Sequence, residues 1–156
     1  MNKGKIMKPD IRFLVQSVQM HFDSIYYYYD KENGDVISIS TDALAAAADS
    51  SNISFRSVDK DEFRLAKALT TNCERYIPLP DSKQCSERKM MESFCKTIEN
   101  EALSEDMLAN VMCKAGEKLF SKDIIKHKLE EKWAAYKNQK YEETIIKWCK
   151  KYNIGV

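Results

Sequence analysis

The chain has few of the residues that build ligand-cradling loops. Only four of its 156 residues are glycine and three are proline. Neither G-x-x-x-x-G-K-[ST] nor G-x-G-x-x-G occurs, so the sequence offers no glycine-rich loop that wraps a phosphate. A G-x-S-x-G nucleophile elbow is also missing. These absences argue against nucleotide binding of the common kinds.

Metal-binding and nucleophile patterns are missing too. His21 and Asp23 lie close in the sequence, but a zinc site needs three or four ligands and no cluster of His or Cys accompanies them. The acids of 59–62 lack the glycine and the distal glutamate of a calcium loop, and they are typical of the first turn of a helix. We therefore expect no metal ion, no cofactor and a non-enzymatic protein. An active site assembled from scattered acids and histidines stays open as an alternative.

No charge of one sign dominates the chain. Its 25 basic and 24 acidic side chains leave a net charge of +1, so no global field draws it onto nucleic acid or anionic lipid. Both ends of the chain are nevertheless basic. Residues 117–156, for example, hold ten lysines against six acids. That distribution is explained either by a basic patch or by solvated helix faces.

The chain also lacks disulfide patterns and long apolar runs. Its five cysteines are an odd number without a C-x-x-C pair, and no apolar stretch suits a secretory signal or a membrane span. We expect a cytoplasmic protein without a membrane partner and with reduced thiols, of which Cys95, Cys113 and Cys149 are buried in helices. The length predicts a single domain over 1–156 with a flexible arm at 1–8.

Apolar spacing predicts a helix and a small antiparallel β-element in the first half of the chain. After Pro9, apolar residues recur with helical spacing from Ile11 to Phe22. The run Ile25–Tyr29, a turn at Asn33-Gly34 and the alternating segment Val36–Ser40 predict a β-hairpin. Further along we expect a short helix over 41–51, a short strand around 53–55, a helix over 59–69 and an edge strand at 76–80.

The second half predicts helices only, which makes the fold class α+β. Apolar stripes with helical spacing run through 90–98, 107–112, 124–136 and 141–152. Ser104 and Ser121 are interpreted as N-caps of the second and third of these helices, and Gly116 as the residue that ends the second. The two tryptophans, Trp133 and Trp148, are expected in the core.

Several short segments together carry a family resemblance. They are Tyr27–Asp30, Asn33–Val36, Tyr76–Pro78, Met91 with Phe94, Trp133 with Tyr136, Ile146–Trp148, and Asn153 with Ile154. In this order they resemble a bacterial family known as uncharacterised protein family 0158, over residues 23–156. The resemblance implies a soluble bacterial protein without an assigned reaction.

Two features suggest binding. On a strand, Tyr26 and Tyr28 share one face, where they either stack on bases or lie under covering helices. Lys147, Lys150 and Lys151 project from the last helix, where they either contact phosphates or simply favour the helix dipole. The leading hypothesis is a non-enzymatic regulatory or protein-binding module with an unidentified protein partner, and the alternative is a nucleic-acid-binding protein that uses these five residues. The oligomeric state stays open.

Overall fold

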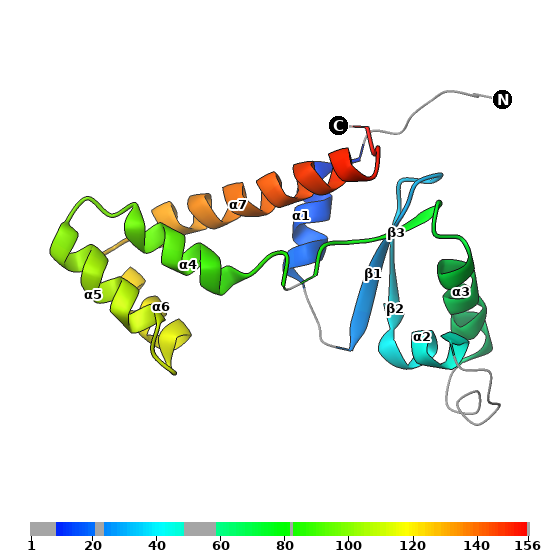
Figure 1. Ribbon diagram of the computed structural model, residues 1–156, viewed down its shortest axis with the longest axis horizontal. Helices are drawn as coiled ribbons and strands as arrows, with labels where there is room; N and C mark the ends of the chain where they lie inside the picture. The colour runs from blue at the N-terminus through cyan, green and yellow to red at the C-terminus, as the bar shows by residue number, and fades with distance from the viewer. Residues whose placement is uncertain (1–8, 21–23, 49–58, 82, 156) are drawn as a thin grey trace. The chain divides into compact units, whose positions relative to one another are not determined.

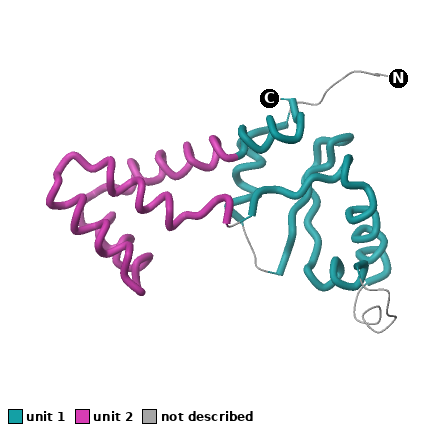
Figure 2. The backbone as a smooth tube through the Cα atoms, in the orientation of Figure 1, with its two compact units in different colours: residues 1–81, 145–156 teal, residues 82–144 magenta. Residues whose placement is uncertain are grey.

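The computed structural model describes residues 9–20, 24–48, 59–81 and 83–155 (Figure 1). The chain divides into two compact units: residues 1–81 with 145–156 form unit 1, and residues 82–144 form unit 2 (Figure 2). Both units are built as the α+β class predicts, since unit 1 holds the sheet and unit 2 is helical. The predicted arm at 1–8 and the short strand around 53–55 lie outside the described residues.

Helix α1 (Ile11–Gln19) opens unit 1, as its apolar spacing predicts. Its N-cap is Asp10, whose carboxylate accepts the backbone N–H groups of Arg12 at 3.0 Å and Phe13 at 3.4 Å. These bonds satisfy two of the donors that a helix start leaves open. The buried face of the helix carries Leu14, Val15 and Val18.

The predicted hairpin is confirmed. Strands β1 (Ile25–Asp30) and β2 (Val36–Ser40) pair antiparallel, with Tyr27 opposite Ser38. Gly34 takes the positive φ of 75° that the turn requires. Strand β3 (Tyr76–Pro78) pairs with the other side of β1, so the order is β2-β1-β3 and β3 is the expected edge strand.

Helices cover both faces of this sheet. On one face, α2 (Thr41–Ala48) and α3 (Lys60–Thr71) bury Ile39 in a cluster that Tyr28 borders. On the other face, Tyr29 meets the edge of Trp148 at a centroid distance of 5.9 Å, and the indole N–H of Trp148 donates to the carbonyl of Pro78 at 2.9 Å. Trp148 belongs to α7 (Glu130–Lys151), whose residues 145–151 are part of unit 1.

Unit 2 is built from α4 (Glu87–Lys96), α5 (Glu101–Val111), α6 (Gly116–Lys126) and residues 130–144 of α7. Its core centres on aromatic rings that meet edge to face, with Phe94 5.3 Å from Trp133 and Phe120 4.9 Å from Trp133. Such pairs add to the stabilisation that apolar burial already supplies. The same core holds Met91, Cys95, Met107, Val111 and Ile124.

Several predicted boundaries in unit 2 are wrong. The stripe 124–136, predicted as one helix, is divided, since α6 ends at Lys126 and α7 begins at Glu130. Ser104 lies inside α5, because Asn100 caps that helix through the N–H of Leu103 at 3.2 Å. Ser121 lies inside α6, and Gly116 begins α6 instead of ending α5. The glycine is there for packing: a Cβ at Gly116 would overlap the backbone carbonyl of Val111.

The described helices include none that is long and apolar enough to cross a membrane.

Candidate functional site

The structure separates the two candidate tyrosines by exposure. Tyr26 is 52% exposed near the start of β1. Tyr28 shares its face, as predicted, but is partly covered by the cluster under α2 and α3. Burial raises the pKa of Tyr28, with smaller contributions from Tyr26 and Cys73. Only Tyr26 therefore presents an open ring.

The three candidate lysines lie at the other end of β1. Lys147, Lys150 and Lys151 are all exposed on the last turns of α7. The ammonium group of Lys31 donates to the carbonyl of Tyr152 at 3.1 Å, which holds this end of α7 beside the hairpin turn (Figure 1). Tyr26 lies five residues before Lys31, roughly 17 Å along an extended chain. Tyr26 and the lysines thus do not form one continuous patch.

A buried carboxylate organises the hairpin turn. Asp30 is 2% exposed and accepts hydrogen bonds from Arg75 Nε and Nη2 at 3.0 Å each, from Asn33 Nδ2 at 3.1 Å and from the backbone of Glu32 at 3.0 Å. The hydrogen bonds from Arg75 are the largest cause that lowers the pKa of Asp30 below its ordinary 3.8. Because its oxygens are occupied by partners of the turn itself, this carboxylate serves the fold.

A second buried polar pair lies in unit 2. The hydroxyl of Tyr141, a residue only 3% exposed, donates to Oε1 of Glu87 at 2.7 Å. Burial and then the carboxylate of Glu87 raise the pKa of Tyr141. The apolar stripe in the sequence marks Tyr141 as buried, but nothing in the stripe indicates Glu87 as its partner. This pair joins α4 to α7 and shows no open face for a substrate.

The thiols divide into buried and exposed ones. Cys95 and Cys149 are buried as predicted, and burial raises the pKa of each to about 11. Cys113 is exposed, so the prediction that it is buried is wrong. It lies beyond the end of α5, which stops at Val111, and therefore outside the buried face of that helix.

Possible metal ligands lie apart in the described residues. Within 9–20, 24–48, 59–81 and 83–155, no three His, Cys, Asp or Glu side chains gather as metal ligands. His127 is exposed at the end of α6, and His21 lies outside the described residues. Within the residues that the structure describes, every buried side-chain nitrogen or oxygen atom has a hydrogen-bond partner.

Unit 1 presents a small apolar cavity beside exposed apolar side chains. The cavity encloses about 100 Å³ where α1 ends and β1 begins. The hydroxyl of Tyr27 donates to the carbonyl of Met20 at 3.1 Å and so joins these two elements. Phe13 lies two turns before Met20 on the same side of α1. We call Phe13, Met20, Tyr26 and this cavity the α1–β1 surface; the cavity is lined by Val18, Ile25, Tyr26, Tyr27, Pro78, Leu79, Pro80 and Asp81.

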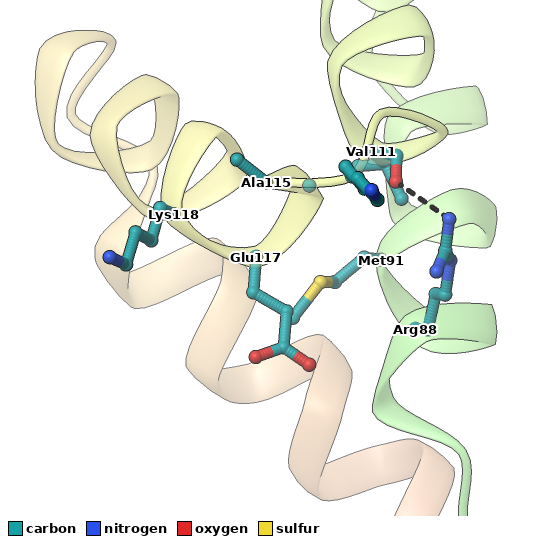
Figure 3. Close-up of a pocket in the computed structure, with 8 residues that line it drawn as sticks. Arg88, Met91, Val111, Ala115, Glu117 and Lys118 are labelled. Atoms are coloured by element: carbon teal, nitrogen blue, oxygen red, sulfur yellow. Dashed lines mark hydrogen bonds between the residues drawn. The ribbon is translucent and has the colours of Figure 1, made fainter.

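Unit 2 holds a larger pocket where α5 ends and α6 begins (Figure 3). Its volume is about 400 Å³. Arg88 forms one wall, and its Nη2 donates to the carbonyls of Val111 at 3.3 Å and Met112 at 3.5 Å. No local pattern in the sequence indicates this pocket, because its residues come from two distant stretches, 88–91 and 111–118. They are Arg88, Met91, Val111, Lys114, Ala115, Gly116, Glu117 and Lys118.

Comparison with known proteins bears on identity but not on mechanism. Searches of the curated proteins and of the solved structures find no match to this chain. A family model matches residues 6–156, which confirms the resemblance seen in the sequence and extends it toward the N-terminus. The hairpin, β3 and the aromatic residues of α7 all fall within the matched range. The chain therefore belongs to the uncharacterised protein family UPF0158.

Proposed function

We propose that this protein is a non-enzymatic regulatory module that binds another protein through its α1–β1 surface. The observation that carries the proposal is an apolar cavity whose lining includes the 52% exposed Tyr26, in a unit that also exposes Phe13 at 47% and Met20 at 61%. Exposed apolar side chains that stand singly on a surface need no explanation, whereas an exposed ring that lines an apolar cavity is a candidate for an interaction site.

The chemistry of the surface fits an apolar segment of a partner protein. The cavity is lined by prolines, aromatic rings and aliphatic side chains, with Asp81 at its margin. Its volume of about 100 Å³ suits one apolar side chain and is well below the roughly 300 Å³ at which small-molecule pockets begin. Phe13, on α1, and Met20, at its C-cap, are further exposed apolar side chains of the same unit. Aromatic residues and methionine are enriched at the centres of such interfaces.

The nucleic-acid alternative needs Tyr26 and the C-terminal lysines to act together. These groups lie at opposite ends of β1, and Tyr28 is partly covered. This arrangement favours the protein partner, and the experiment below separates the two.

The test is an affinity pull-down from the native host's lysate with tagged full-length chain, run with and without nuclease. Two double variants are compared with the wild type. The first combines Phe13→Gln with Tyr26→Thr, which removes two rings from the surface and replaces them with residues suited to a helix and a strand. Met112→Gln with Ile125→Gln is the matched control, because these side chains are 61% and 66% exposed in unit 2.

We expect one near-stoichiometric protein partner that survives nuclease, is retained by the unit 2 control and is lost from the Phe13/Tyr26 variant. Equal retention by both variants, or loss from both, would contradict the proposal. Recovery of RNA or DNA, with proteins lost on nuclease treatment, would favour the nucleic-acid alternative instead.

A further inference from the structure

The pocket of unit 2 concentrates positive charge around one cavity. Three of the side chains that line it are cationic, Arg88, Lys114 and Lys118, and one is acidic, Glu117. The charged lining therefore carries a net charge of +2. Figure 3 shows Arg88 and Lys118 at opposite ends of the group of lining residues, with the ammonium group of Lys118 directed outward.

These cations have no counter-ion within the described part of the chain. No ion pair joins Arg88, Lys114 or Lys118 to an acidic side chain there. Arg88 donates through Nη2 to the two carbonyls at the end of α5, which fixes the guanidinium at the wall. Its Nε–H and Nη1 donors have no bond to a described residue. Like charges gathered without a partner repel each other, and an anion removes that repulsion.

Backbone N–H groups at the start of α6 add hydrogen-bond donors at the pocket, and their partial charge is positive. Ala115 precedes α6 and provides no side-chain cap, and the N–H of Gly116 donates to the carbonyl of Cys113 at 3.0 Å, which leaves the next two N–H groups of α6, those of Glu117 and Lys118, without a cap. Gly116 lets this turn approach the carbonyl of Val111, which any larger residue would hit. These donors supplement the cationic side chains.

We propose that this pocket binds a small organic phosphate ester. A phosphate monoester carries a charge of about −1.5 to −2 at neutral pH, which matches the net charge of the lining. The cavity volume of about 400 Å³ is at the lower end of small-molecule sites and exceeds what a bare phosphate fills. Met91, Val111 and Ala115 supply an apolar wall for the organic part of the ligand.

The experiment is an NMR titration of the isotope-labelled full chain with phenyl phosphate. Inorganic phosphate and neutral benzyl alcohol are titrated alongside, to separate the contributions of the charged group and the ring. The test variant is Lys114→Gln with Lys118→Gln, and Arg88 is left in place because it also supports the end of α5. The matched control is Lys122→Gln with Lys126→Gln, on the same helix but outside the pocket.

We expect phenyl phosphate to shift the backbone signals of residues 114–119 and to bind more tightly than either reference compound. The Lys114/Lys118 variant should bind phenyl phosphate about tenfold more weakly or worse, because each of its two substitutions removes a charge-assisted contact. The Lys122/Lys126 control should bind as the wild type does. Unchanged signals at millimolar phenyl phosphate, equal weakening by both variants, or equal binding of inorganic phosphate would each overturn the proposal.

Discussion

At the scale of single residues, the hydrogen bonds of the buried carboxylate Asp30 stabilise the hairpin turn. Asp30 receives donors from Arg75, Asn33 and the backbone of Glu32, all within or beside one hairpin turn. A buried carboxylate loses its hydration, and only a full set of donors offsets that loss. The turn therefore depends on the charged form of Asp30.

Replacing Asp30 by Asn should lower the free energy of unfolding by about 2–3 kcal/mol, because a buried acceptor becomes an amide facing donors. Urea unfolding followed by circular dichroism measures this. The control is Glu32→Gln, since Glu32 is an exposed partner of Arg75 and should cost less than about 1 kcal/mol. A loss for Asp30→Asn no larger than that of the control would contradict the argument.

The pH dependence of the same site has a definite sign. The pKa of Asp30 is lower in the folded chain than its ordinary 3.8, so the folded state favours the charged form. Its stabilisation is complete above the ordinary value and is lost as the pH falls below it toward the lowered pKa. The stability difference between wild type and Asp30→Asn should therefore shrink as the pH drops below about 4. A difference that stays constant as the pH falls well below about 4 would show that the charge is not responsible.

At the scale of elements, the sequence predicts best where a local signal decides the structure. The hairpin was predictable because Asn33-Gly34 demands a turn and the flanking residues suit strands. The junction between α5 and α6 was not predictable, because a glycine is required at 116 by the close approach of the backbone carbonyl of Val111, which belongs to α5. The partial burial of Tyr28 likewise comes from α2 and α3, and the pocket of unit 2 is lined by two distant stretches, 88–91 and 111–118.

Gly116→Ala tests that contact between elements. The added Cβ overlaps backbone, which shifts less readily than a side chain, so we expect a loss of about 2 kcal/mol or more in unfolding free energy. Lys122→Ala, exposed on the same helix, should change stability by less than about 0.5 kcal/mol. Thermal unfolding of the two variants provides the measurement, and equal melting temperatures would refute the explanation of Gly116.

At the scale of the whole molecule, the thiols report on both cores. Cys149 is buried in unit 1 and Cys95 in unit 2, whereas Cys73 and Cys113 are exposed. Alkylation of the native chain followed by mass spectrometry should therefore label Cys73 and Cys113 and leave Cys85, Cys95 and Cys149 unlabelled. Labelling of Cys95 or Cys149 without denaturant would contradict the described burial.

The same labelling tests the prediction of a single domain. Helix α7 supplies residues to both cores, so melting it should expose Cys95 and Cys149 together as urea is raised. Loss of protection at two different urea concentrations would show two domains that unfold separately.

The division of α7 also sets an order of events on the ribosome. All residues of unit 2 precede Ile145. The contact between Tyr29 and Trp148, which covers one face of the sheet, forms after Trp148 has been synthesised. During synthesis, which proceeds from the N-terminus, the sheet emerges first and is completed last. The face of β1 that carries Tyr29 thus lacks its contact with Trp148 until α7 has left the exit tunnel, and apolar surface exposed during such an interval is what chaperones bind.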